Sequence, residues 1–164
     1  MSRLYVICGP AGVGKSTFGK KLAAEKKGCF LDSDTVSEAT VRAGLELASL
    51  DPDDRDSAIY KATFRDEVYE SLYAVAHENL PRLPVVMVGP FTREIRDSGW
   101  KRFLEEKFAV PVEVIFVICP SEERQRRIRD RGNPRDASKL ADWSAYLAQS
   151  DESPPAFSHQ VVET

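Results

Sequence analysis

The sequence has few of the features that mark membrane, secreted or zinc-binding proteins. No apolar run approaches the roughly 20 residues that a membrane-spanning helix needs, so we expect no membrane contact. The first predicted strand begins at residue 3, so we expect no signal peptide. The three cysteines, Cys8, Cys29 and Cys119, do not have the spacing of a zinc site. We expect them to be reduced, mostly buried thiols of a cytoplasmic protein.

Internal repeats, low-complexity linkers and an excess of positive charge are also absent. The chain has 164 residues, and its 23 Lys and Arg against 26 Asp and Glu give a net charge of −3. This balance argues against a protein that coats nucleic acid, although it leaves room for a local basic site. The length suits one domain with a core of its own. We therefore expect a single domain over residues 1–164, and the oligomeric state stays open.

What the sequence does contain is a phosphate-binding loop. Residues 9–17 read GPAGVGKST and fit the pattern G-x-x-x-x-G-K-[ST]. Glycines let backbone N–H groups turn inward around an anion, and a helix that starts near Lys15 directs its positive end at the same anion. Lys15 can reach the β- and γ-phosphates, and the Ser16 hydroxyl is placed to bind Mg²⁺. The predicted nucleotide-binding residues are Gly9, Ala11, Gly12, Val13, Gly14, Lys15, Ser16 and Thr17.

Short apolar runs alternate with helical patterns along the chain. This alternation predicts a parallel sheet that is covered by helices on both faces. The fold class is therefore α/β, a three-layer P-loop NTPase fold with about five strands, in which ligands bind at the carboxyl ends of the strands. We predict strands at 3–8, 29–31, 85–88, 112–118 and 159–163, and helices at 15–26, between 34 and 49, and at 54–80, 92–108, 121–131 and 137–149.

Two carboxylates one residue apart follow the second predicted strand. Asp32 and Asp34 are expected at the same sheet edge as the phosphate-binding loop. One of them can organise Mg²⁺ through its water shell, and the other can orient or deprotonate an acceptor hydroxyl. The alternative interpretation is a surface turn in which Asp34 or Thr35 caps the next helix. The residues by themselves leave open which carboxylate has which role.

An arginine-rich run follows the fourth predicted strand. Arg127 and Arg131 are four residues apart and share one helix face. Guanidinium groups in this arrangement can bind the oxygens of a phosphoryl group during its transfer. For Arg124, Arg126 and Arg129 we expect a solvated face.

Two signatures of other nucleotide-binding proteins are missing from the sequence. No acidic residue ends the apolar strand at 85–88, where many ATPases have one that organises the metal. No N-K-x-D-like guanine signature is present either. Both absences argue against a motor ATPase and a GTPase.

Together these segments resemble the small P-loop kinases of the nucleoside-monophosphate-kinase-like class over nearly the whole chain. This class includes shikimate kinase, gluconate kinase, antibiotic-modifying phosphotransferases and the kinase domain of polynucleotide 5′-kinase. The resemblance rests on GPAGVGKST, on LDSD at 31–34, on VVMVGPF at 85–91 and on the run R-x-x-x-R-G-N-P-R-D from Arg127 to Asp136. The turn at 89–91 stands where shikimate kinases have a glycine triplet, so shikimate is not the expected acceptor.

The resemblance also implies roles for individual residues. Asp32 would serve the magnesium, and Asp34 would contact the acceptor hydroxyl as the base. The arginine-rich helix would begin a mobile lid over about residues 124–139, with Arg127 and Arg131 as phosphate clamps.

We therefore expect an ATP-dependent kinase that uses ATP and Mg²⁺ to phosphorylate a hydroxyl group of a small molecule. One alternative is a polynucleotide 5′-hydroxyl kinase-like enzyme. Such an enzyme needs a basic channel for the nucleic acid, and the acidic stretch 51–54 argues against one. The other alternative is a nucleotide-binding ATPase or switch without a small-molecule acceptor. The expected catalytic residues are Lys15, Asp34, Arg127 and Arg131, the metal-binding residues are Ser16 and Asp32, and the acceptor-side candidates are Asp34, Arg42, Arg65, Arg93 and Arg96.

Overall fold

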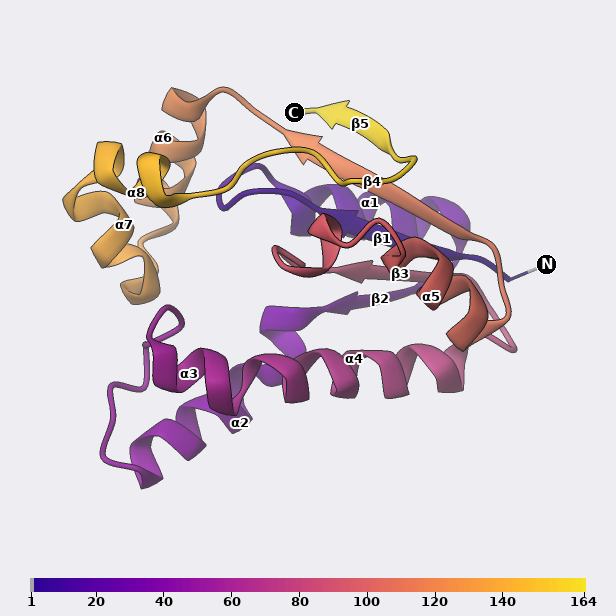
Figure 1. Ribbon diagram of the computed structural model, residues 1–164, viewed down its shortest axis with the longest axis horizontal. Helices are drawn as coiled ribbons and strands as arrows, with labels where there is room; N and C mark the ends of the chain where they lie inside the picture. The colour runs from indigo at the N-terminus through magenta and orange to yellow at the C-terminus, as the bar shows by residue number, and fades with distance from the viewer. Residues whose placement is uncertain (1) are drawn as a thin grey trace.

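The computed structural model describes residues 2–164 and places a five-stranded parallel sheet at the centre of the molecule (Figure 1). The strand order is β2-β3-β1-β4-β5. Because every pair is parallel, all five carboxyl ends lie at one edge of the sheet. The strands are β1 (Leu4–Cys8), β2 (Cys29–Asp32), β3 (Val85–Val88), β4 (Val112–Ile118) and β5 (Gln160–Glu163).

The central strands form because their sequences are apolar and rich in β-branched residues, which suits strands that are buried on both faces. All residues of β1 and β3 are buried. Alternate side chains point to opposite faces, so Val6 belongs to one core cluster and Ile7 to the other. The α/β fold with a parallel sheet of five strands, predicted from the sequence, is confirmed.

Helices cover both faces of this sheet (Figure 1). On one face, α1 (Lys15–Lys26) packs against the cluster that contains Ile7 and Val88. On the other face lie α2 (Ser33–Leu47), α4 (Arg65–Asn79) and α5 (Trp100–Phe108), whose buried side chains join the larger cluster around Val6 and Met87. No helix within residues 2–164 combines the length and the apolar character needed to cross a membrane.

The remaining helices stand beyond the carboxyl ends of the strands. The short α3 (Ala58–Thr63) precedes α4, and a second group follows β4 on the opposite side of the same edge (Figure 1). This second group consists of α6 (Ser121–Arg131), a 3₁₀ turn (Pro134–Asp136), α7 (Ala137–Ala141) and α8 (Trp143–Gln149).

Three predicted helices are interrupted in the structure. The single helix expected at 54–80 is divided at Phe64, whose ring stacks on Tyr60 at a centroid distance of 6.0 Å. The helix expected at 92–108 is a 3₁₀ turn (Glu94–Arg96) followed by α5, because the Asp97 carboxylate accepts a hydrogen bond from Gly99 N and turns the chain. The helix expected at 137–149 divides at Asp142, whose carboxylate caps α8.

Candidate active site

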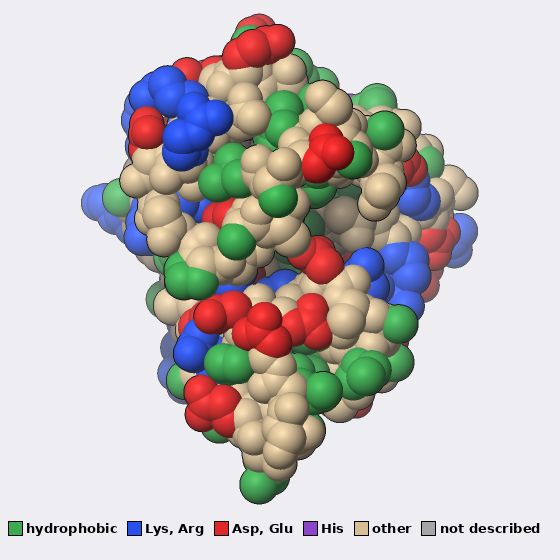
Figure 2. Space-filling model, turned by 90° about the vertical axis from the view of Figure 1, so that its left-hand side faces the viewer, with side chains coloured by type: hydrophobic (Ala, Val, Ile, Leu, Met, Phe, Trp, Pro, Cys, Tyr) green, Lys and Arg blue, Asp and Glu red, His purple; other side chains and the backbone are tan. Residues whose placement is uncertain are grey.

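A large cleft opens at the carboxyl edge of the sheet, with a volume of about 1040 Å³. Its floor is the loop between β1 and α1, and its walls come from α2–α4 on one side and from α6–α8 on the other. Figure 2 views the molecule from this side and shows the surface hollowed between the two walls, with acidic side chains along the opening.

The loop between β1 and α1 has the backbone shape that its glycines allow. Gly9 has φ 138°, and a Cβ atom there would stand 2.3 Å from the Val117 carbonyl oxygen. Gly12 has φ 81°, and a Cβ atom there would stand 2.9 Å from the Arg124 carbonyl oxygen. Both positions therefore need glycine for backbone conformation and for space. Of the predicted nucleotide-binding residues all but Val13, which is buried in the core, line the cleft: Gly9, Ala11, Gly12, Gly14, Lys15, Ser16 and Thr17.

The Lys15 ammonium group lies inside this loop. Its Nζ donates hydrogen bonds to the carbonyl oxygens of Gly9 at 2.9 Å and Pro10 at 2.7 Å. Burial lowers the pKa of Lys15 to about 8, and the nearby Asp34 carboxylate opposes that shift. A partly buried ammonium that is held by two neutral carbonyls is poised to gain from an anionic partner such as a phosphate.

Ser16, in the first turn of α1, contacts Asp32 at the end of β2. The Ser16 hydroxyl donates to Asp32 Oδ2 at 2.5 Å, and Asp32 Oδ1 accepts from Asp34 N at 2.9 Å. Asp32 is thus the N-cap of α2, which fixes its buried carboxylate on the hydroxyl. Hydroxyl and carboxylate oxygens are the ligands that Mg²⁺ prefers, and a site with few protein ligands leaves room for phosphate oxygens. These residues fit a magnesium ion.

Asp34 differs from Asp32 in its surroundings. Its side chain is 66% exposed, and it lines the cleft from the first turn of α2. The capping role that the sequence left open for Asp34 belongs to Asp32. The Asp34 carboxylate is not needed for the helix cap, and it accepts a hydrogen bond from Arg135 at 2.9 Å.

Arg124 corrects one expectation from the sequence. The prediction of a solvated face holds for Arg126 and Arg129, which are exposed, but it is wrong for Arg124, whose side chain is only 2% exposed. Its Nε donates to the Ala11 carbonyl oxygen at 2.9 Å, and its two terminal nitrogens bind Glu152 at 2.6 and 2.7 Å. The helix face that contains Arg124 turns toward the loop, so this residue connects α6 to the phosphate-binding loop.

Arg127 and Arg131 both line the cleft, as the spacing predicts. Arg127 binds Glu123 through Nε at 2.7 Å and donates to the Thr164 hydroxyl at 3.0 Å. Hydrogen bonds from Arg126 and Arg127 lower the pKa of Glu123 to about 2. Arg131 binds the buried Asp136 through Nε at 2.7 Å. Each of the two therefore has one edge of its guanidinium held by a carboxylate.

Among the acceptor-side candidates, the structure brings only Asp34 and Arg65 into the cleft lining. Arg65 donates to Glu94 at 2.8 Å and lies over the ring of Tyr69 at 5.4 Å. The remaining candidates make contacts outside that lining: Arg42 pairs with Asp53, Arg93 pairs with Asp66, and Arg96 donates to the carbonyl oxygens of Asp151, Ser153 and Pro154.

Several cleft residues were missed by the sequence reasoning. Arg55, Tyr60, Lys61 and Arg135 line the cleft although no motif marked them individually. Arg135 lies inside the recognised run R-G-N-P-R-D, so the run was the available signal for it. The other three come from the region around α3, which only the folded chain brings to the site.

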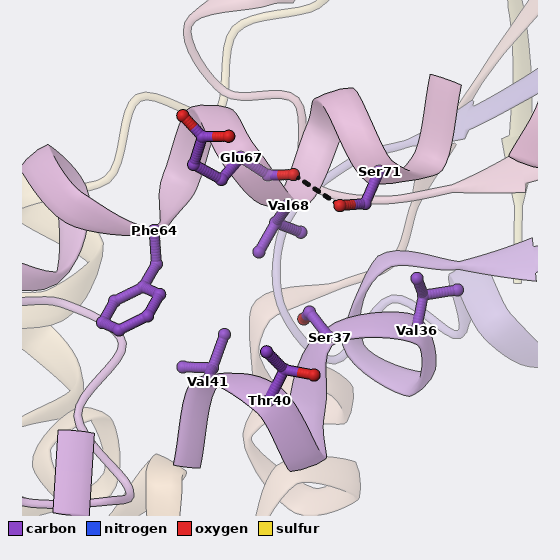
Figure 3. A pocket seen from close by; sticks show the side chains of 8 residues that line it. All are labelled: Val36, Ser37, Thr40, Val41, Phe64, Glu67, Val68 and Ser71. Atoms are coloured by element: carbon purple, nitrogen blue, oxygen red, sulfur yellow. Dashed lines mark hydrogen bonds between the residues drawn. The ribbon is translucent and has the colours of Figure 1, made fainter. Parts of the chain in front are cut away.

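A second, smaller cavity lies between α2 and α4 and has a volume of about 110 Å³ (Figure 3). Apolar side chains and hydroxyl groups line it, and its Ser71 hydroxyl donates to the Glu67 carbonyl oxygen at 2.9 Å. Ser37 and Val68 also line the large cleft, so the two cavities share a wall. The full lining is Val36, Ser37, Thr40, Val41, Phe64, Glu67, Val68 and Ser71.

Comparisons with known proteins identify the family of this chain. A family model described as an AAA domain matches residues 4–152. A guanylate kinase of Prochlorococcus marinus subsp. pastoris is 29% identical over 147 residues, which cover 83% of this chain and 76% of that protein.

Solved structures show the same fold at low sequence identity. A protein of Chloroflexus aurantiacus that is assigned as a kinase has a TM-score of 0.70 at 16% identity, covering 99% of this chain and 87% of the other. A gluconokinase from Sinorhizobium meliloti has a TM-score of 0.58 at 17% identity, covering 97% and 81%. The resemblance to small P-loop kinases is confirmed, and the chain belongs to the AAA domain family of P-loop proteins.

Proposed function

We propose that the protein is an ATP-dependent kinase that transfers the γ-phosphoryl group of ATP to a hydroxyl group of a small molecule. The observation that carries this proposal is the placement of Asp34. Its exposed carboxylate faces the same cleft as the phosphate-binding loop, and it stands two residues from the Asp32–Ser16 pair. A second carboxylate at this point is placed to orient an attacking hydroxyl group and to take its proton.

In this proposal the residues of the cleft divide the work of binding, positioning and charge stabilisation. The backbone of residues 9–17 holds the phosphates of ATP, and Lys15, Arg127 and Arg131 offset the negative charge on the transferred group. Ser16 and Asp32 hold Mg²⁺, which when bound neutralises phosphate charge. Asp34 orients the acceptor hydroxyl and takes its proton.

The alternative acceptors are a phosphate group, as the name of the guanylate kinase relative indicates for that protein, and the 5′ end of a nucleic acid. A carboxylate favours a hydroxyl acceptor over a phosphate, because the negative charges of Asp34 and a phosphate would repel each other. The acidic stretch 51–54, which precedes the cleft residue Arg55, disfavours a polyanion for the same reason. We also propose that the segment of about 124–139 moves as a lid, with Arg124 as its anchored end.

The proposal is tested by a screen of acceptors with ATP, in which ADP release is measured above the level without acceptor. The panel contains sugars, sugar acids, nucleosides, nucleoside monophosphates and a 5′-hydroxyl oligonucleotide. We expect turnover with a small hydroxyl compound and none with the oligonucleotide. Turnover confined to nucleoside monophosphates or to the oligonucleotide would refute the proposed acceptor class.

Two lysine variants test the site itself. Lys15→Ala should abolish most of the turnover while the protein stays folded, because the ammonium that meets the phosphates is lost. Lys21→Ala is the matched control, since Lys21 is an exposed lysine on the same helix. Equal rates in Lys15→Ala and wild type would show that this loop is not the active site.

A further inference from the structure

Arg135 crosses the cleft and binds two carboxylates on the opposite wall. Its Nη2 donates to Asp34 Oδ2 at 2.9 Å, and its Nη1 donates to Glu38 Oε2 at 2.8 Å. Asp34 and Glu38 are four residues apart on α2, so they share one face of that helix. Arg135 itself belongs to the 3₁₀ turn between α6 and α7. One planar guanidinium therefore joins the expected lid to the helix that contains the proposed base.

The arginine side of this contact is enclosed, whereas Asp34 and Glu38 are 66% and 38% exposed. The Arg135 side chain is 13% exposed, and its Nε is buried without a hydrogen-bond partner. Burial opposes the charged form, but Asp34 and Glu38 outweigh it and raise the pKa of Arg135. Leaving Nε unpartnered costs free energy. The two carboxylates must therefore hold Arg135 in place against that cost.

Two further basic residues contact carboxylates of this wall, Arg55 from within the wall and Lys139 from across the cleft. Arg55 donates to Glu38 Oε2 at 3.3 Å, while its other terminal nitrogen is fixed by the carbonyl oxygens of Pro52 and Asp54. Lys139, one turn beyond Arg135, lies 3.3 Å from Asp56 across the cleft. Two residues of the segment 134–139, Arg135 and Lys139, thus make three ionic contacts with the wall formed by α2 and the loop before α3.

We propose that Arg135 occupies the place of the acceptor hydroxyl at Asp34, and that this contact prevents the transfer of the phosphoryl group to water. The inference rests on the proposed function. Hydrolysis would require water to attack the γ-phosphorus, ADP to leave with the electrons of the broken P–O bond, and Asp34 to take a proton from the water. With Arg135 on Asp34 Oδ2, a water must compete with the guanidinium for that oxygen, so the base is less accessible to it.

A true acceptor removes this block because it brings its own hydroxyl to Asp34. It displaces Nη2 from Asp34, while Nη1 stays on Glu38 and keeps the lid closed over the reacting groups. Arg135 is thus a positioning residue that acts through Asp34. It makes phosphoryl transfer depend on an occupied acceptor site, in the way that a closing lid excludes water in other enzymes.

The first test measures phosphate release from ATP without any acceptor. Arg135→Ala should raise this rate by about fivefold, the change that corresponds to an ion-pair contribution of roughly 1 kcal/mol. Arg135→Lys should lie between Arg135→Ala and wild type, because an ammonium keeps the charge but lacks the planar fork that places one donor on each carboxylate. Arg129→Ala is the matched control, since Arg129 is exposed on α6. Adding Asp34→Asn to Arg135→Ala should remove the gain.

A rate in Arg135→Ala that equals or falls below that of wild type would overturn the inference. So would a gain that persists after Asp34→Asn, because Arg135 would then not act through Asp34. Thermal unfolding of each variant establishes that the comparison is made between folded proteins.

The second test uses hydrogen exchange without nucleotide and needs no activity. Backbone amides of residues 33–40 and 134–142 should exchange faster in Arg135→Ala than in Arg129→Ala or wild type. Unchanged exchange would refute the contact between lid and α2, whatever the enzyme does. Faster exchange in a protein that neither binds nor hydrolyses ATP would support the contact and refute the proposed function, so the two failures are distinguishable.

Discussion

We predict that the contact between Arg124 and Glu152 contributes strongly to the free energy of unfolding. Glu152→Ala removes the carboxylate that binds both terminal nitrogens of a guanidinium that is only 2% exposed. Deleting one partner of a buried ion pair costs about 3–5 kcal/mol. Glu152 itself is 30% exposed, so water can replace part of the lost contact, and we expect a loss of roughly 2–3 kcal/mol. For a chain of this size that loss lowers Tm by about 4–12 °C.

Urea and thermal unfolding followed by circular dichroism measure this loss. The control is Asp130→Ala, which removes an ion pair with Arg126 on α6, the helix that also contains Arg124. Those two side chains are 60% and 59% exposed, so the control should change the free energy of unfolding by at most about 1 kcal/mol.

A second readout follows from the geometry of the loop. Arg124 also donates to the Ala11 carbonyl oxygen, so Glu152→Ala should raise the KM for ATP, whereas Asp130→Ala should not. If Glu152→Ala is no more destabilising than Asp130→Ala, the reasoning about the buried pair is wrong.

Three further outcomes are expected. ATP with Mg²⁺ should raise the Tm in differential scanning fluorimetry, because a ligand that binds only the folded state stabilises it; an unchanged Tm would contradict nucleotide binding. The pKa of Lys15 is about 8 in the free protein, and bound phosphates favour its charged form. The affinity for ATP should therefore be steady below pH 8 and fall above it, which calorimetry can measure. A constant affinity from pH 7 to 9 would refute that linkage. Asp34→Asn should lower kcat by about 100-fold or more with little change in ATP affinity. Asp32→Asn should instead raise the Mg²⁺ concentration needed for half-maximal rate. Steady-state kinetics that show the reverse pattern would mean that the two roles are exchanged.

The sequence determined most of the fold because its signals are local. Short apolar, β-branched runs such as Val85–Val88 are typical of strands inside a covered sheet. Residues 9–17 specify a phosphate-binding loop through the conformation and space that their glycines allow and through Lys15 and Ser16. The carboxyl ends of parallel strands share one edge, so the proximity of Ser16, Asp32 and Asp34 also followed from the order of elements.

The interruptions of helices depended on less local information. The sequence around Phe64 has a continuous helical pattern, yet the helix divides there, where Phe64 stacks on Tyr60. The Tyr60–Phe64 pair has the i, i+4 spacing of a helix, so the apolar pattern gave no sign of the φ of −114° at Phe64, and the expected helix at 54–80 was too long.

Only the tertiary structure decided which charges are buried and which side chains meet across the cleft. Arg124 and Arg126 are two residues apart in one basic run, but α6 turns the first toward Ala11 and the second toward solvent. Arg135 and Asp34 are separated by 101 positions, and their contact exists because the lid segment folds over the end of the sheet. Composition and spacing describe what each residue can do, whereas burial and long-range contact depend on how the elements pack.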